Sequence, residues 1–243
     1  MNITQDTPVG SIVVERLGRA SVFERLGIDY CCHGATPLEK ACAERSLDVD
    51  HVLAEIAESD QRGVNEDVDR VDYSAMPAGD LADQIVATHH VYLRRELPRL
   101  SELIDKVVAA HSSNHPELIE VRQTFAALRQ ELEMHLMKEE RVLFPLVKQL
   151  EAALEPFSIH CGTVENPIRV MEHEHDSAGS ALQRIRELTS NYRAPDDGCA
   201  SFTALYDGLS CLESDLHLHI HKENNILFPR AAALESALMA AKC

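Results

Sequence analysis

The amino-acid sequence predicts an all-α protein, an antiparallel four-helix bundle preceded by a small helical domain. Apolar residues recur at spacings of three and four along almost the whole chain, which is the period of a helix that is buried on one side. Runs of alternating β-branched residues are nearly absent, and glycine and proline are sparse between the expected turns. These observations leave no stretch that favours a sheet.

Four long periodic stretches form the predicted bundle, which spans residues 79–243. Short segments rich in proline, glycine, asparagine and aspartate separate them and predict turns. Helices of this length with short connections pack antiparallel to their neighbours in the chain. The expected helices cover roughly residues 79–110, 117–151, 166–191 and 198–240.

The first part of the chain differs from the bundle. Residues 1–60 contain shorter helical stretches, arranged around the motif Asp29-Tyr-Cys-Cys-His-Gly34. This pattern predicts a small helical domain. Residues 61–78 are acidic and polar, and we expect them to form a linker that lets this domain move relative to the bundle.

Composition narrows the classes of function. The formal net charge of −17 argues against a nucleic-acid partner bound through its phosphates. No apolar run is long enough for a membrane span, and residues 1–10 lack a signal peptide's basic and apolar regions, so we expect a cytoplasmic protein without a membrane partner. The seven cysteines include no Cys-x-x-Cys pair, which predicts reduced thiols.

An internal repeat is the strongest pattern in the sequence. The segment that begins His135-Leu-Met-Lys-Glu139 recurs 84 residues later as His219-Ile-His-Lys-Glu223, and both copies continue to Leu-Phe-Pro, where we expect the straight helix to end. A further histidine precedes each copy: His90 lies 45 residues before the first, and His175 lies 44 residues before the second. Two copies of one helical hairpin would build a pseudo-symmetric bundle.

The spacing within the repeat points to metal binding. Side chains four residues apart on a helix point the same way, one turn apart, so a histidine and a glutamate can reach one ion. On the first copy this face also holds Leu128, Leu132 and Val142, so the pair should look into the bundle; the second copy has the same pattern. A buried carboxylate costs several kcal/mol unless a cation compensates its charge.

Other histidines compete for the same role. The face of His175 is apolar and that of His173 is polar, which favours His175. His217 and His221 lie on the opposite side of their helix from His219, so we expect both to face outward. The choice of His90 over His89 rests only on the repeat spacing and stays open.

The donor set predicts the metal. Four imidazoles and two carboxylates exceed one tetrahedral zinc ion and suit two six-coordinate ions, iron or manganese, with Glu139 and Glu223 as bridges and a bridging oxo or hydroxo group. Because each hairpin joins its own pair, we expect His90 with His135 on one ion; the pairing of ligands across hairpins remains an alternative. Glu131 and Asp215, one turn before the repeated histidines, are expected to orient their rings.

The ordered set of motifs resembles a known family. The motifs are Asp29 to Gly34, His90 with Arg-Glu-Leu-Pro98, His135 to Pro145, Val170-Met-Glu-His-Glu-His-Asp176, and His219 to Pro229, and they cover nearly the whole chain. This pattern resembles the hemerythrin-like di-iron bundle and, more closely, the iron–sulfur cluster repair di-iron proteins. Oxygen-carrying hemerythrins resemble it less, because they lack the Cys-Cys domain.

The resemblance implies a function. A protein of this family would use two non-haem irons to repair iron–sulfur clusters damaged by nitrosative or oxidative stress, with damaged or apo iron–sulfur proteins and nitric oxide as partners. Cys31 and Cys32 would then act outside the di-iron site, in handing on iron or nitric oxide. The alternatives are a sensor or carrier of a diatomic gas, and an enzyme such as a nitric oxide reductase or peroxidase. The sequence leaves open whether the protein is an enzyme and whether it forms a homodimer.

Overall fold

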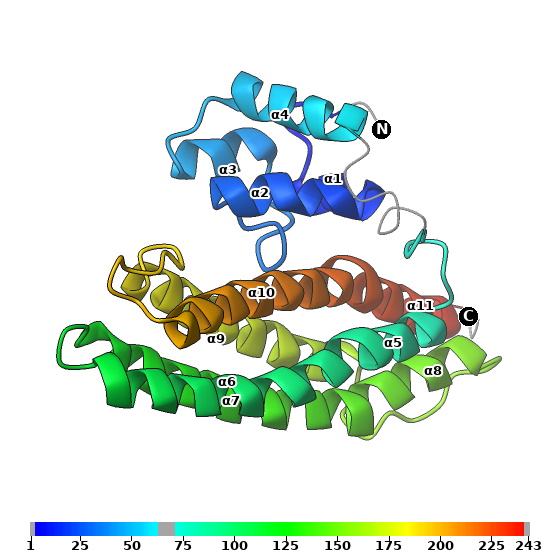
Figure 1. Cartoon of the computed structure of the whole chain (residues 1–243). Helices are drawn as coiled ribbons and strands as arrows, with labels where there is room; N and C mark the ends of the chain where they lie inside the picture. The colour runs from blue at the N-terminus through cyan, green and yellow to red at the C-terminus, as the bar shows by residue number, and fades with distance from the viewer. Residues whose placement is uncertain (1–2, 63–70, 241–243) are drawn as a thin grey trace. The chain divides into compact units, whose positions relative to one another are not determined.

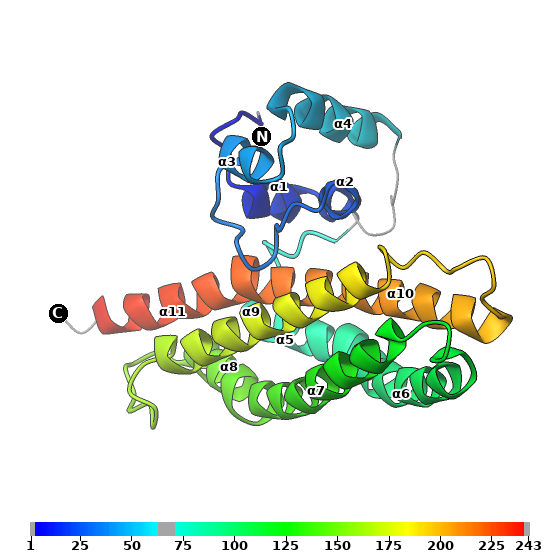
Figure 2. The same cartoon turned by 90° about the vertical axis from the view of Figure 1, so that its left-hand side faces the viewer.

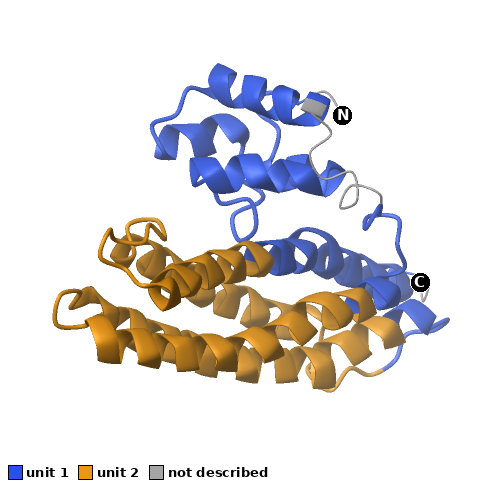
Figure 3. Ribbon diagram, in the orientation of Figure 1, with its two compact units in different colours: residues 1–82, 150–157, 217–243 blue, residues 83–149, 158–216 orange. Residues whose placement is uncertain are grey.

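The computed structural model describes residues 3–62 and 71–240 and is helical throughout, with no β-strand in these ranges. It divides into two compact units (Figure 3). One unit comprises residues 83–149 and 158–216, and the other comprises residues 1–82, 150–157 and 217–243. The prediction of an all-α fold is confirmed. The expected linker lies partly outside the described residues, and the domain boundaries stay predictions.

The unit of residues 83–149 and 158–216, orange in Figure 3, is a four-helix bundle (Figure 1). Its helices pack around one continuous apolar core, to which each of the four contributes large side chains such as Leu100, Phe125, Leu182 and Leu209. Seen from the side, the four run alongside one another (Figure 2). They are α6 (Val91–His111), α7 (Glu117–Lys138), α9 (Glu165–Leu188) and α10 (Ala200–Lys222), the last of which continues into the other unit.

The other unit gathers the N-terminal helices with the last part of the chain. Four α-helices and a 3₁₀ turn surround a core that includes Phe23, Tyr30 and Leu38, and Ile220 from the end of α10 joins this core. The N-terminal elements are α1 (Val9–Glu15), η1 (Leu17–Arg19), α2 (Ala20–Leu26), α3 (Leu38–Glu44) and α4 (Val49–Arg62). The remaining helices of the chain are α5 (Ala78–Ile85), α8 (Phe144–Ala152) and α11 (Phe228–Ala240).

Three of the long helices contain a π-helical turn that the sequence did not predict. These turns are η2 (Val86–His90), η3 (Glu139–Leu143) and η4 (Glu223–Leu227). A π turn holds one more residue than an α turn and is typical of functional sites. The helix continues beyond Pro145 and Pro229, because the wider turn relieves the clash between a proline ring and the preceding turn. The π turns η3 and η4 thus interrupt the regular α-helix just before Leu-Phe-Pro, and helical structure then continues to residues 152 and 240, close to the expected ends at 151 and 240.

The π turn η3 also shifts the apolar face of its helix. Val142, expected inside on the face of His135, is 51% exposed, and the next residue, Leu143, is buried in its place. The extra residue rotates the helix by about 100° at this point. The turn itself begins at Glu139, one of the predicted ligands.

Candidate metal centre

All six predicted ligands are buried. None of the residues His90, His135, Glu139, His175, His219 and Glu223 is more than 3% exposed. Two groups of four could each hold a metal ion, and within each group the ligand atoms lie within 4.8 Å of one another. One group is His90, Glu139, His219 and Glu223, and the other is His135, Glu139, His175 and Glu223.

Glu139 presents its two carboxylate oxygens to two different imidazoles. Its Oε1 lies 3.0 Å from Nε2 of His135, and its Oε2 lies 3.4 Å from Nε2 of His90. In the second copy of the repeat, Nε2 of His219 lies 3.1 Å from Oε1 of Glu223. The i, i+4 spacing thus brings each histidine of the repeat to its glutamate, as the sequence predicted.

The expected pairing of the histidines is wrong. His135 was expected to share an ion with His90, but its Nε2 lies 3.1 Å from Nε2 of His175. The two rings are also in contact, with centroids 4.8 Å apart. The reason is the packing of the bundle, because α7 lies against α9 along its length, so the two hairpins share their ligands.

Carboxylates fix the orientation of two of the rings, but they are not the predicted ones. His135 Nδ1 lies 2.9 Å from Glu174, and His90 Nδ1 lies 2.7 Å from Glu140. Glu131 instead accepts a hydrogen bond from Ser177. The carboxylate of Asp215 lies 2.9 Å from Nδ1 of His89, which is buried beside His90 and stands in neither ligand group.

Both orienting carboxylates are held ionised by cations. Burial raises the pKa of Glu174, but hydrogen bonds from Lys138 and His135 outweigh it, so the pKa lies below its usual value. The pKa of Glu140 is lowered in the same way, against the effect of burial, by Arg94 and His90. Ionised carboxylates accept the Nδ1–H protons, which directs the Nε2 lone pairs toward Glu139.

This donor set fits a metal. His135 and His175 cannot both carry a proton on Nε2, because two N–H groups cannot face each other at 3.1 Å. A lone pair is therefore aimed into a group that already holds buried carboxylates, and a cation resolves the conflict. Imidazole and carboxylate donors together suit iron or a similar transition metal better than soft metals.

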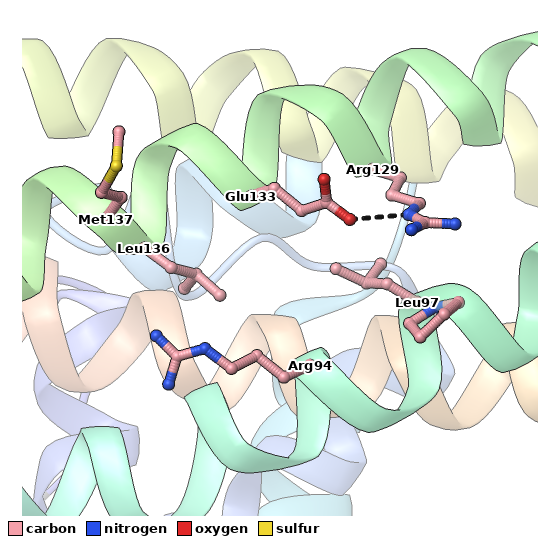
Figure 4. A pocket seen from close by; sticks show the side chains of 7 residues that line it. Arg94, Leu97, Arg129, Glu133, Leu136 and Met137 are labelled. Carbon is pink, nitrogen blue, oxygen red and sulfur yellow. Dashed lines mark hydrogen bonds and ion pairs between the residues drawn. The ribbon is translucent and has the colours of Figure 1, made fainter.

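A surface pocket of about 350 Å³ lies on the bundle between α6 and α7 (Figure 4). Arg94 on its rim pairs with Glu140, the carboxylate that orients His90. Across the pocket, Arg129 bonds Glu133, as the dashed line shows. The pocket walls are Arg94, Leu97, Pro98, Arg129, Glu133, Leu136 and Met137, none of which is a predicted ligand.

The second histidine prediction that fails concerns His221. It was expected to face outward, but it is fully buried, its ring lies 5.4 Å from that of Tyr30, and burial lowers its pKa to about 4. His217, on the same side, is 21% exposed and lies 3.7 Å from Glu24. The N-terminal helices cover this side of α10, which a periodicity argument confined to the bundle could not anticipate.

The cysteine motif lies against the turn that carries Glu223. Asn224 donates a hydrogen bond to the carbonyl oxygen of Cys31 at 3.3 Å. Asn225 donates to the same oxygen at 3.1 Å and to that of Tyr30 at 3.3 Å. The loop is thus bonded to the residues that follow Glu223, and the expectation that Cys31 and Cys32 act outside the di-iron site stays a prediction.

The cysteines themselves lie close together in one loop. Cys31 and Cys32 are not joined in a disulfide, and their sulfur atoms lie 3.8 Å apart. The hydrogen bond with Cys32 and burial raise the pKa of the Cys31 thiol well above its ordinary value. Nδ1 of His33 lies 2.7 Å from the carboxylate of Asp29. The Cys31 thiol is therefore not set up as a free nucleophile.

Most of the chain matches known protein families and proteins of known name. Residues 81–231 match the model of the hemerythrin HHE cation-binding domain, and residues 5–60 match ScdA_N, a domain of unknown function. The iron–sulfur cluster repair protein YtfE of Enterobacter sp. (strain 638) is 35% identical over 95% of this chain and 99% of its own length. Proteins of the same name from Escherichia coli O81 (strain ED1a) and Escherichia fergusonii are 34% identical over the same shares.

Proposed function

We infer the function of this chain from the family to which it belongs, the iron–sulfur cluster repair proteins that carry a hemerythrin HHE domain. We propose that it repairs iron–sulfur clusters damaged by nitrosative or oxidative stress, and that it acts in the cytoplasm on damaged or apo iron–sulfur proteins. No helix in the described part of the chain is long and apolar enough to cross a membrane. The alternatives, a gas carrier and a nitric oxide reductase or peroxidase, are not favoured.

The proposed centre holds two irons through His90, His135, Glu139, His175, His219 and Glu223. The observation that carries this proposal is the position of Glu139, whose two oxygens face the Nε2 atoms of different histidines. Such a carboxylate can bridge two ions, and Glu223 is the other carboxylate common to both ligand groups. Bound iron would supply metal for a damaged cluster and would bind nitric oxide.

The protein's own residues control this centre. Glu140 and Glu174 hold two of the imidazoles with Nε2 directed at the metal positions, and the buried surroundings exclude bulk water. We propose that Cys31 and Cys32, whose loop is bonded to the residue after Glu223, take part in handing iron or nitric oxide to the partner protein.

Anaerobic mixing with an iron–sulfur enzyme whose cluster has been damaged by nitric oxide tests the function. We expect the iron-loaded chain to restore the enzyme's activity while it loses iron, and the His135→Ala variant to fail. His173→Ala is the control for the loss of a histidine that is not a ligand, because His173 lies on α9 beside the predicted ligand His175 but is exposed. Equal recovery with the wild-type chain and with a His135→Ala variant shown to have lost iron would reject the proposal.

A further inference from the structure

A second group of metal-binding side chains lies outside the bundle. Asp29, Cys31 and Cys32 each offer a ligand atom, and these atoms lie within 4.8 Å of one another. All three residues come from a single loop between α2 and α3. From the arrangement of this loop we infer that Cys31 and Cys32, with Asp29 as a third donor, form a second, labile metal site for a divalent transition-metal ion.

The distances match those of a tetrahedral ion. With metal–sulfur bonds of about 2.3 Å and a tetrahedral angle, two thiolate ligands lie about 3.8 Å apart. The sulfur atoms of Cys31 and Cys32 are 3.8 Å apart. A carboxylate oxygen at about 2.0 Å from the same ion would lie about 3.5 Å from a sulfur, and Asp29 Oδ1 lies 3.4 Å from Cys31 Sγ.

Side-chain hydrogen bonds to its backbone hold the loop in this arrangement. Within the loop, Asp29 Oδ1 accepts hydrogen bonds from the N–H groups of Cys31 and Cys32, at 3.0 and 2.9 Å. From η4, the Asn224 side chain donates to the carbonyl oxygen of Cys31, and that of Asn225 donates to the carbonyl oxygens of Cys31 and Tyr30. The two thiols are therefore ordered before any ion arrives, which lowers the entropy cost of binding.

Binding is a simple exchange of protons for metal. In the metal-free loop, S–H groups occupy the contacts between the two sulfurs and between Cys31 and Asp29. A divalent ion displaces both thiol protons, which pass to the solvent, and no electron is transferred. The site has three protein ligands and so keeps a fourth position for water or for a ligand from another protein.

The position suits an ion in transit. Cys31 is 4% exposed while Cys32 is half-buried and His33 is exposed, so one side of the site faces solvent. The other side is bonded to Asn224, which directly follows the predicted ligand Glu223. This inference rests on the proposed function in one respect only, that the ion passing through the loop during repair is Fe²⁺.

Cobalt titration tests the site without reference to repair. Co²⁺ is added anaerobically to the full, iron-loaded chain, and difference spectra are recorded for thiolate-to-cobalt charge transfer, which the histidine and carboxylate ligands of the bundle cannot give. We expect saturation near one Co²⁺ per chain. We expect the band to vanish in Cys31→Ser/Cys32→Ser and the affinity to fall about ten-fold or more in Asp29→Asn, which keeps the hydrogen-bonding oxygen.

Two further variants keep the outcome decisive. Cys199→Ser/Cys211→Ser removes two exposed thiols and must keep the band. Cys32→Ala alone, at the half-buried position, must weaken it even if the double variant fails to fold. No band in the wild-type chain, or a band that survives loss of both loop thiols, would overturn the site. Repair that fails while the cobalt band stays would instead reject the proposed function, and intact repair without the band would reject only this site.

Discussion

The Nε2 atoms of His135 and His175 lie 3.1 Å apart inside the bundle, although 40 residues and a change of hairpin separate them. They therefore belong to one predicted ion, and His90 and His219 belong to the other. The ligands of each ion come from both halves of the internal repeat. Neither hairpin alone can complete a site.

This pairing makes the loss of iron non-additive in a defined way. We expect His135→Ala and His175→Ala each to lower the iron content by about one ion per chain, and the double variant to lose little more, since both ligands serve the same ion. His90→Ala/His135→Ala should lose both irons. Iron analysis of the purified variants checks this, and the reverse result would restore the pairing within hairpins.

The carboxylates behind the rings are expected to matter for affinity rather than for folding. Glu174→Gln removes the charge that orients His135, so we expect iron affinity to fall about 10- to 100-fold, measured by competition with a chelator. Glu131→Gln is the control, because Glu131 bonds only the Ser177 hydroxyl among the side chains near it. A similar loss in both variants would contradict the role of Glu174.

The contact between the cysteine loop and η4 needs a glycine. A Cβ on Gly34 would collide with the Asn225 side chain and lie 2.9 Å from the carbonyl oxygen of Tyr30. We expect Gly34→Ala to destabilise the protein by about 1–3 kcal/mol in urea unfolding. Asn225→Ala should relieve part of the collision, so that the double variant costs less than the sum of the two single changes. Strict additivity would show that the two residues do not meet.

The stability of the fold should depend on pH through a contact between His115 and Asp197, which lie in two loops of the bundle. His115 Nε2 lies 3.0 Å from Asp197, and this hydrogen bond raises the pKa of His115 while that of Asp197 is lowered. A raised histidine pKa stabilises the fold below the unfolded pKa of about 6.5, and the effect is lost as pH rises through the folded value.

The difference in melting temperature between the wild-type chain and His115→Gln isolates this effect. We expect it to be larger at about pH 5.5 than at about pH 8.5, since the two pH values lie on either side of the histidine pKa. High salt should shrink the difference at the lower pH, because this exposed pair is screened. A difference independent of pH would contradict the prediction.

Much of the site could be predicted because helical periodicity is strict over short distances. The i, i+4 rule placed His135 with Glu139, and the polar neighbours of His173 selected His175 instead. Beyond one turn the rule failed, since the π turn at Glu139 put Val142 in solvent. No residue type marks a π turn, so its position follows from packing rather than from local propensity.

The remaining differences concern partners distant in the sequence. Glu131 was expected to orient His135 because it lies one turn away on the same helix. The residue that does so, Glu174, lies on another helix, and a single sequence does not show which helices are neighbours. His221 was expected outside because its partner Tyr30 lies in the N-terminal segment. Which helix packs on which, and what covers the far side of α10, are properties of tertiary structure that periodicity does not encode.

The three widened turns make the count of residues part of the metal-binding motif. Each adds one position to its helix, and everything that follows is turned by about 100° relative to an uninterrupted helix. Deleting Val142, which is 51% exposed, would remove no predicted ligand, yet it would turn Phe144 and the rest of α8 away from their present neighbours. Within these three turns, the deletion of an exposed residue is therefore expected to be more harmful than most substitutions. Relatives should accordingly differ in the identity of the residues in these turns far more readily than in their number.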